Sequence, residues 1–557
     1  MSNRAPAVLL TLLLAALAVL AGPTAPASAD DVTPGVHPLV TGLQADPGSG
    51  VSFRGRLYFI GYSDSQVRLW ATDGTVGGTG PVSTATDVAS LVVVGDRLLF
   101  SGTDQEHGNE WWTTDGTAAG TRLLADIYPG DRPSSPRSPV LLGGLLYFNA
   151  TEPVHGSELW VTDGTSTGTR LAADVVPGPD SSFPEQLTAL DDRVVFLGQL
   201  ADRTARLSAF VPSTGSTVQL DTMPVPFDGS PRLLARVGSQ VLFWASDLAH
   251  GFELWATSGQ PGSVHMVSDI DPGPSNGGPD PILVLGGLAV FPSFNPDVGQ
   301  ELWVSDGTAV GTRLVRDIRP GPASSGVDDL VVLGGRLLFT ADDGVHGREL
   351  WETQGTLDST RLVADVRPGP EDGTELSTDG GATVAGQLLF AGRGADGLEP
   401  WVTDGSTAGT RELADLVPGP AGSASYPIGS LGNTLVLGQS FPTTDQLFTW
   451  TAVASSTSIT VRRRYSAHQA RHRRIRLPVT VTSPAGSLSG GTVTLTRRGR
   501  VVGTAPLVNG RAVVQLTARV RARHRYVVSA HWTGTVDATG STSAEVRIRV
   551  RHRRHRH

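Results

Sequence analysis

The chain has 557 residues, a formal net charge of −9 and no cysteine, and its 44 basic residues are all arginine. The lack of cysteine excludes disulfides, a lipid-anchored N-terminal cysteine, and thiolate nucleophiles or metal ligands. This net charge is the sum of two regions with opposite charge. Residues 30–455 hold 22 Arg against 51 Asp and Glu, a balance of −29, whereas residues 456–557 hold 21 Arg against two acidic residues, a balance of +19. Such asymmetry indicates that the basic part is an interaction region.

The first 29 residues have the pattern of a secretion signal. Arg4 is followed by an apolar run, 7–21, and by Ala27-Ser28-Ala29, a small-residue cleavage site. We therefore expect cleavage after Ala29 and a secreted, extracellular protein that associates with the cell envelope. No other stretch reaches the roughly 20 apolar residues of a membrane span, so we expect none in the mature chain.

A repeated sequence motif occupies most of residues 30–455. Its tryptophan recurs about every 48 residues, as between Trp303 and Trp351. The copy at 329–365 contains four segments of four to six residues, rich in Val, Leu, Phe, Trp and Thr and separated by glycine turns. This composition favours strands over helices. Each Asp-Gly-Thr is typical of a hairpin turn. We interpret each repeat as four antiparallel strands.

Four-stranded units of this length, repeated many times, are typical of a β-propeller. We predict an all-β fold with a propeller of eight to nine blades over residues 30–455. The segment at 37–43 matches a fourth strand without its first three, and the last copy, at 431–453, lacks its fourth. We therefore predict that the N-terminal segment completes the last blade and closes the ring, which removes an exposed sheet edge.

At ELWVTDGT (158–165) and ELWVSDGT (301–308), the repeat resembles the ELWxxDGT family of exported bacterial proteins. The resemblance covers most of residues 37–455. It implies an exported repeat protein and supplies no shared activity and no catalytic residues. The fourth copy departs from the pattern, because Ala205-Arg206-Leu207-Ser208 replaces Glu-Leu-Trp and the Asp-Gly-Thr is lost.

The loops between the second and third strands carry an acid, a histidine and a glutamate at three-residue intervals. Four repeats contain this trio: Asp104, His107 and Glu110; Glu152, His155 and Glu158; Asp247, His250 and Glu253; Asp343, His346 and Glu349. Because the trio recurs, we interpret it first as structural, with the acid capping loop N–H groups. The alternatives are a calcium site, for which the acid and the histidine of each trio are the candidates, and acid/base catalysis. We predict no catalytic residue and no other cofactor.

The periodic tryptophans have a packing interpretation and a binding one. One indole per blade is expected where blades stack face to face. Trp111 and Trp244 lie outside the periodic set, so we regard them as better candidates for stacking on sugars.

The basic part predicts a second domain. Residues 456–550 show short alternating strands with glycine turns, which suggests an immunoglobulin-like sandwich. The segments GTVTL, VVGTAPLVNGRA and YVVSAHWTG resemble bacterial Ig-like repeats, and residues 551–557 form an Arg/His-rich tail. We expect the arginines to bind anionic polymers, with these candidates: Arg462, Arg463, Arg464, Arg471, Arg473, Arg474, Arg476, Arg553 and Arg554. Few aromatic residues accompany them, so we do not expect sequence-specific nucleic-acid binding.

These observations favour an exported, non-enzymatic binding or scaffold protein. The propeller would present a ligand face to a surface protein or glycan, and the basic domain would hold the molecule on a cell-wall or other extracellular anionic polymer. The alternative is a propeller enzyme that acts on extracellular glycans at its central channel. An enzyme would need a few non-repeating polar residues that converge in the channel.

Overall fold

The structure is a computed structural model that describes residues 35–117, 119–199, 201, 204–220, 232–247, 249–274, 281–375, 383–384, 386–394, 397–417, 419, 422–440, 445–451, 456–459, 475–482, 492–497, 500–516, 526–535, 538–542 and 546–548. The expected signal peptide (1–29) and the C-terminal tail (551–557) lie outside these residues. Apart from strands, the described part of the chain contains two short 3-10 helices, η1 (Leu357–Ser359) and η2 (Thr407–Gly409). Neither helix is long or apolar enough to cross a membrane.

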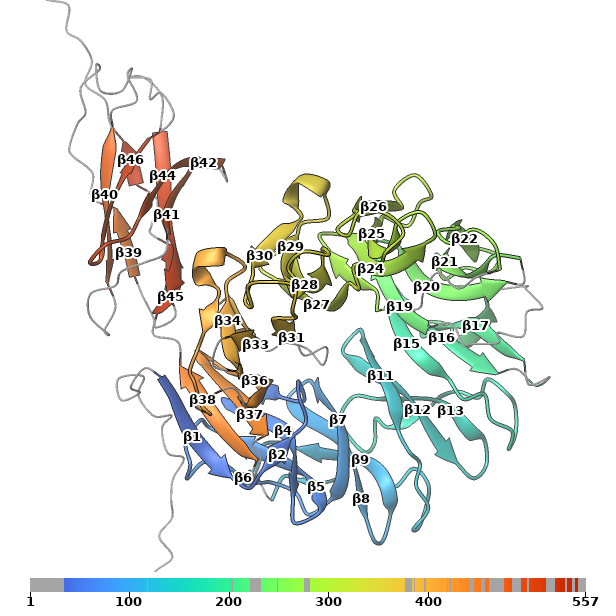
Figure 1. Ribbon diagram of the computed structural model, residues 1–557. Coiled ribbons are helices and arrows are strands. Elements are labelled where there is room, and N and C mark those ends of the chain that lie inside the picture. The colour runs from blue at the N-terminus through green and yellow to red at the C-terminus, as the bar shows by residue number, and fades with distance from the viewer. Residues whose placement is uncertain are drawn as a thin grey trace, which may run out of the picture. The chain divides into compact units, whose positions relative to one another are not determined.

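The described residues between 35 and 451 form nine antiparallel sheets of four or five strands, arranged as a ring of blades (Figure 1). The predicted β-propeller is therefore confirmed, with nine blades. In eight of the nine blades the strands follow one another in chain order across the sheet. The first strands of successive blades contact each other, as β11 with β15 and β15 with β19, which places them at the inner edge of the ring. The first strands are β2 (Gln44–Ala45), β3 (Val51–Phe53), β7 (Thr86–Val94), β11 (Arg137–Leu142), β15 (Glu185–Leu190), β19 (Arg232–Val237), β23 (Leu283–Leu285), β27 (Asp328–Leu333), β31 (Thr374–Glu375), β32 (Thr383–Val384) and β36 (Ala424–Leu431).

The second and third strands form the buried middle of each blade, and their apolar runs explain why. The second strands are β4 (Arg56–Ser63), β8 (Arg97–Asp104), β12 (Leu145–Glu152), β16 (Arg193–Gln199), β20 (Gln240–Asp247), β24 (Leu288–Asn295), β28 (Arg336–Asp342), β33 (Gln387–Gly394) and β37 (Thr434–Ser440). The third strands are β5 (Gln66–Thr72), β9 (Gly108–Thr114), β13 (Gly156–Thr162), β17 (Ala205–Val211), β21 (Gly251–Thr257), β25 (Gly299–Ser305), β29 (Arg348–Thr353), β34 (Gly397–Thr403) and β38 (Gln446–Thr451). The degenerate fourth copy still forms its third strand, β17. In this strand a buried Ser208 occupies the position that tryptophan has in the other repeats.

The fourth strands are short and lie at the outer edge. They are β1 (Gly35–Thr41), β6 (Gly80–Pro81), β10 (Arg122–Leu123), β14 (Arg170–Ala173), β18 (Ser216–Gln219), β22 (His265–Ser268), β26 (Arg313–Arg316), β30 (Arg361–Ala364) and β35 (Arg411–Glu412). The N-terminal β1 pairs with β38 as the fourth strand of the last blade. The predicted closure of the ring is therefore confirmed.

Neighbouring blades pack through the tryptophan of the third strand. Trp112 belongs to a buried cluster with Tyr58 and Leu69 of the preceding blade. In the same way, Trp351 packs with Val290 and Leu302. The packing interpretation of the periodic tryptophans is confirmed, and burial of these large rings between blades supplies much of the core.

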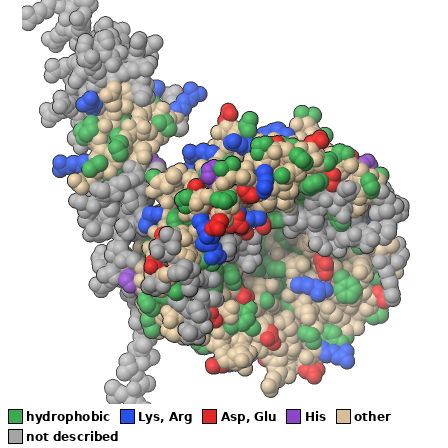
Figure 2. Space-filling view, in the orientation of Figure 1, with side chains coloured by type: hydrophobic (Ala, Val, Ile, Leu, Met, Phe, Trp, Pro, Cys, Tyr) green, Lys and Arg blue, Asp and Glu red, His purple; other side chains and the backbone are tan. Residues whose placement is uncertain are grey.

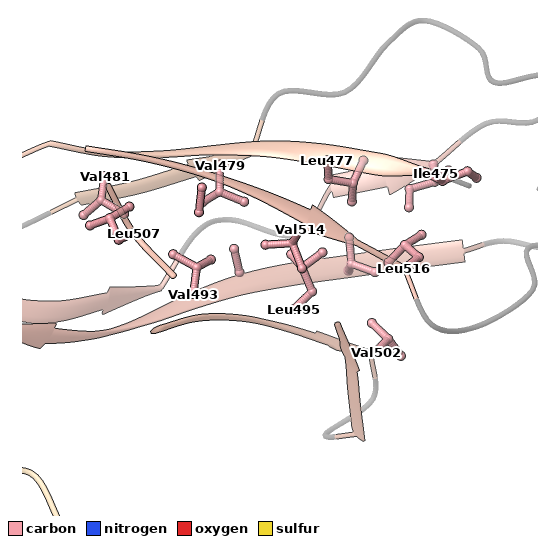
Figure 3. Packing of buried hydrophobic residues seen from close by; sticks show 14 residues of the cluster. Ile475, Leu477, Val479, Val481, Val493, Leu495, Val502, Leu507, Val514 and Leu516 are labelled. Carbon is pink, nitrogen blue, oxygen red and sulfur yellow. The ribbon is translucent and has the colours of Figure 1, made fainter. Parts of the chain in front are cut away.

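The C-terminal part forms two antiparallel sheets around a cluster of its own. One sheet has the order β39 (Ser456–Ile459), β40 (Arg476–Thr482) and β43 (Arg511–Gln515). The other has the order β42 (Arg500–Pro506), β41 (Thr492–Arg497), β44 (Tyr526–Thr535) and β45 (Ala538–Thr542), with β46 (Val546–Ile548) also paired to β44. Side chains of both sheets, including Leu477 and Leu495, share one buried cluster (Figure 3). This part is a β-sandwich, and its immunoglobulin-like character stays a prediction.

Candidate functional site

One face of the ring carries both the loops between second and third strands and the linkers between blades. The Ser135 N–H of a linker donates at 3.1 Å to the carbonyl of Asn109, at the start of the third strand where the loop ends. The same contact recurs from Ser325 to Gln300, also at 3.1 Å. We call this side the loop face. The four acid–histidine pairs lie on it.

In each loop the acid binds the loop's own backbone and its histidine. The Asp343 carboxylate accepts the N–H groups of Val345 (2.9 Å) and His346 (3.0 Å), and it lies 2.8 Å from Nδ1 of His346. Asp104 with His107, Glu152 with His155 and Asp247 with His250 repeat this arrangement. The acid therefore caps the turn that leads into the third strand.

The pairing shifts the pKa of both partners. Burial alone would raise the pKa of the Asp343 carboxyl, but hydrogen bonds from the His346 ring and from two loop N–H groups together lower it below its usual value. The hydrogen bond to Asp343 raises the pKa of His346 above its usual value. When the histidine is protonated, the hydrogen bond between the pair is charge-assisted.

The glutamate near the start of the third strand, which completes each trio and also occurs in repeats without a histidine, is buried in the blade. Glu301 is fully buried and accepts the N–H groups of Ile318 (3.1 Å) and Arg319 (3.2 Å) and the Ser325 hydroxyl (2.8 Å). It thus ties the third strand to the linker that leads into the next blade. Burial raises its pKa to about 7, against the lowering effect of these donors.

The serines that bind these glutamates were not predicted from the sequence, although their constant spacing could have identified them. In four repeats the glutamate and the serine are separated by 24 residues: Glu110 and Ser134, Glu158 and Ser182, Glu301 and Ser325, Glu399 and Ser423. A buried carboxylate needs several donors, and a serine at constant spacing after the linker Pro-Gly is the residue to look for.

The acid and the histidine of each trio therefore form one structural unit in the loop, and the glutamate belongs to another unit inside the blade. The oxygens that a calcium ion would need are already engaged by the loop or by the linker. Among the described residues, no group of three or more His, Asp or Glu side chains is placed to hold a metal ion.

The expectation that Trp111 and Trp244 stack on sugars is wrong. Both side chains are 0 % exposed. Trp111 packs edge-on against Phe148 of the next blade, with ring centroids 5.7 Å apart, and Trp244 packs in the same way against Phe291 at 5.2 Å. Each indole thus fills a second interface between blades, where no ligand reaches it.

Near the ends of the first strands, the inner edge of the ring carries few ionisable side chains. Equivalent positions in three blades hold Leu141, Val284 and Val332, whose side chains are 46 %, 39 % and 39 % exposed. The equivalent position on β19 is Arg236, which forms an ion pair with Asp191 at 2.6 Å. The remaining equivalent positions hold Val93, Ala189 and the hydroxyl side chains of Ser52, Thr383 and Ser430.

Of the predicted polyanion-binding arginines, the structure describes Arg476. It lies exposed on the outer surface of β40, where buried and exposed residues alternate. The other eight candidates lie outside the described residues. Arg497, Arg500 and Arg511 are further arginines of this domain, and Arg500 and Arg511 are exposed. Figure 2 shows basic and no acidic side chains on the described part of this domain.

No family model matches the chain, and no curated protein matches it. Solved structures resemble it at low identity. A puromycin hydrolase is 16 % identical over 54 % of this chain and 50 % of its own, with a TM-score of 0.33. A puromycin-hydrolysing peptidase of Mycobacterium tuberculosis is 11 % identical over 72 % and 58 %, with a TM-score of 0.38. The β-propeller domain of the trilobed protease of Pyrococcus furiosus is 12 % identical over 59 % and 97 %, with a TM-score of 0.31. The chain spans about half the length of the puromycin hydrolase. These similarities are too weak to carry an activity to this chain.

Proposed function

We propose that this chain is an exported binding or scaffold protein of the ELWxxDGT-repeat type, without enzymatic activity. Its propeller presents a ligand face, and its basic, Ig-like C-terminal domain adheres to anionic polymers of the cell envelope. One observation carries the proposal: the balance of −29 over residues 30–455 against +19 over residues 456–557.

The opposite charges of the propeller and the C-terminal domain support different roles for them. A region of 21 arginines with two acidic residues attracts polyanions through Coulomb forces and through counterion release, whatever the sequence of the polymer. Arginine suits this role because its planar guanidinium binds phosphate and carboxylate groups in a bidentate way. The acidic propeller is repelled by the same polymer and stays free for another partner.

The loop face supports the role of the propeller in presenting a ligand. Its loops are held by the acid–histidine pairs and by the buried glutamates, so variable side chains are displayed on a rigid frame. An aspartate directly after a fourth strand lies at the same end of its blade as these loops: Asp317 follows β26, and its carboxylate accepts the Gly321 N–H. We therefore expect the propeller's partner to be a surface protein or glycan with a neutral or cationic contact region.

A retention experiment tests the proposal. The chain from residue 30 to 557 and a variant that ends at residue 455 are applied to anionic cell-wall material at low salt. We expect the full chain to bind, the shortened variant to pass through, and the full chain to elute as the Debye length falls below about 8 Å. Retention of the shortened variant, or retention that salt does not change, would contradict the assignment of the anchor to the basic domain.

A further inference from the structure

A cavity of about 270 Å³ lies between the first two blades of the propeller. Its wall consists of Arg56 and residues 77–82 from the first blade and of Gly116 from the second. Arg56 begins β4, residues 77–82 contain β6, and Gly116 follows the end of β9. These strand ends lie opposite to the loop face, so we call this space the turn cavity.

The turn between β5 and β6 departs from the repeat at this cavity. In five other blades the fourth strand begins with an arginine: Arg122, Arg170, Arg313, Arg361 and Arg411. The first blade has Gly80 at this position. A Cβ atom added to Gly80 would meet no atom within 4 Å. The missing side chain therefore leaves space that an arginine occupies elsewhere in the ring.

The seventh blade shows what can fill the equivalent space. Arg336 begins β28 as Arg56 begins β4. Arg361 begins β30, where the first blade has Gly80. The Glu352 carboxylate lies between the two arginines of the seventh blade. It accepts hydrogen bonds from Nη1 of Arg336 at 2.8 Å and from Nε of Arg361 at 2.7 Å. Glu352 is 7 % exposed, so this position of the fold holds a buried carboxylate.

Strand register identifies the same position in the first blade. Leu338, two residues after the start of β28, pairs with Glu352. Tyr58, two residues after the start of β4, pairs with Ala71. Ala71 therefore takes the place of Glu352, and it belongs to the buried cluster with Trp112 of the second blade. The first blade thus has the arginine that begins the second strand and lacks the carboxylate that binds this arginine in the seventh blade.

Arg56 is placed to bind an anion in the turn cavity. Among the described residues, its hydrogen bonds run through Nη2, which donates to the carbonyl of Gly78 at 2.6 Å and to that of Ala71 at 3.5 Å. A guanidinium has five N–H donors in a fixed fork, so these bonds orient the group and leave Nε and Nη1 for a ligand. Within the described part of the chain Arg56 forms no ion pair, whereas its neighbour Arg54 pairs with Asp96 at 3.6 Å.

The cavity also limits the size and the character of its ligand. Since a water molecule occupies roughly 30 Å³ of the liquid, 270 Å³ corresponds to about nine water molecules. Pro81 and Val82 add apolar surface to the wall. Three of the four residues 77–80 are glycine, so this part of the wall is mainly backbone. A small molecule with one anionic group and a short aliphatic chain fits these features.

We propose that the turn cavity binds a small organic acid, whose carboxylate takes the place that Glu352 has in the seventh blade. Arg56 donates charge-assisted hydrogen bonds to this carboxylate, and the aliphatic part of the acid packs against Pro81 and Val82. The site lies on the opposite side of the ring from the loop face, and it does not depend on the proposed function.

Calorimetric titration of the chain from residue 30 to 557 with butanoate tests the proposal. Butanoate reproduces a glutamate side chain from Cα to the carboxylate, and for so small a ligand we expect a dissociation constant in the millimolar range. Arg56→Gln should weaken binding about 10- to 100-fold, the loss that corresponds to a charge-assisted hydrogen bond. Arg193→Gln is the matched control, because Arg193 begins the second strand of the fourth blade. It should bind butanoate like the wild type.

A second variant tests the cavity without changing the charge. Gly80→Leu places a side chain in the open space, so it should abolish binding of butanoate while thermal melting shows a folded protein. If Arg56→Gln does not fold, Gly80→Leu decides the question alone. No binding of butanoate to the wild type at millimolar concentrations, or equal binding by the wild type and Gly80→Leu, would overturn the site.

Two further ligands test the choice of a carboxylate. Butanamide has the shape of butanoate without its charge, and we expect it to bind at least about tenfold more weakly, since it cannot accept charge-assisted hydrogen bonds. Equal binding of the two would show that Arg56 does not select an anion. Inorganic phosphate that binds more tightly than butanoate, and that Arg56→Gln releases, would overturn the assignment to organic acids.

Discussion

His37 of the first strand lies directly opposite Thr449 of the last blade. The pair joins residues from the two ends of the propeller sequence in one antiparallel ladder. Paired Cα atoms in such a ladder lie about 4.5 to 5.5 Å apart, which is within the range that a disulfide spans. The chain has no cysteine of its own, so an engineered pair has no competing partner.

The double substitution His37→Cys and Thr449→Cys is expected to lock the ring when oxidised. A crosslink between such distant residues constrains the unfolded chain strongly, and typical disulfides stabilise by about 2–4 kcal/mol. Thermal melting with and without a reducing agent measures the gain. The single variant His37→Cys should show no difference between the two conditions. A double variant that does not form the disulfide would contradict the pairing.

Deletion of residues 30–48 is expected to open the ring. The deletion removes β1 and the two-residue β2, so β38 becomes an exposed edge with unpaired N–H and C=O groups, which promotes association. We expect a lower melting temperature and oligomers in size-exclusion chromatography. Deletion of residues 549–557 serves as the control, since it leaves every blade intact. A 30–48 deletion that melts like the parent and stays monomeric would show that closure does not hold the ring together.

Substitution of a buried glutamate should destabilise the propeller. Glu301→Gln keeps the volume but places an amide N–H₂ among the donors of Ile318, Arg319 and Ser325. Leaving buried donors unsatisfied costs about 1–3 kcal/mol. Chemical denaturation measures the loss, and the exposed Glu106→Gln should change stability by less than about 0.5 kcal/mol. Equal effects of the two variants would contradict a role for the buried carboxylate in fixing the linker.

Stability should decrease as the pH rises from about 5 to about 8. Burial raises the pKa of Glu110, Glu253, Glu301 and Glu349 to about 7, and hydrogen bonds to Asp raise the pKa of His107, His250 and His346. Groups with a higher pKa in the folded state stabilise it fully below their unfolded pKa, about 4.3 for Glu and 6.5 for His, and this contribution is lost as the pH rises through the folded pKa.

The opposite trend is expected only at acid pH. Asp104, Asp247 and Asp343 have lowered pKa values, so their contribution disappears as the pH falls below about 4. Melting temperatures measured across the pH range should therefore pass through a maximum on the acid side of neutrality. A melting temperature that increases steadily from pH 5 to pH 8 would contradict the raised pKa values of the glutamates.

Removing a loop histidine should have a small effect. His346→Ala deletes one hydrogen bond, while Asp343 keeps both backbone N–H contacts, so we expect a loss of about 1 kcal/mol or less. The melting temperature of the wild type should not change with EDTA. His265→Ala, at an exposed position outside the loops, is the matched control. A large drop in melting temperature with EDTA that calcium reverses would establish the cation site that the trio suggested.

The repeating unit and the closure of the ring could be predicted from the sequence, because both depend on local patterns. Short apolar segments with Asp-Gly-Thr turns specify four strands per repeat, and a lone fourth strand at 37–43 matches the one that the last repeat lacks. The role of the periodic tryptophans also followed from their spacing, since a residue that recurs once per blade must occupy the same interface each time.

The neighbours of each side chain depend on how the blades and strands pack in three dimensions. Trp111 and Trp244 look unusual in the sequence, but each fills a second interface that only the stacking of blades creates. The acid, histidine and glutamate of the trio are close in sequence, yet the pleat of the strand directs the glutamate into the blade, where Glu110 and Glu158 each accept a hydrogen bond from a serine 24 residues away. The strand pairing of the C-terminal sandwich could not be predicted either. Pairing between distant strands is set by the shared core, and spacing along the chain does not encode it.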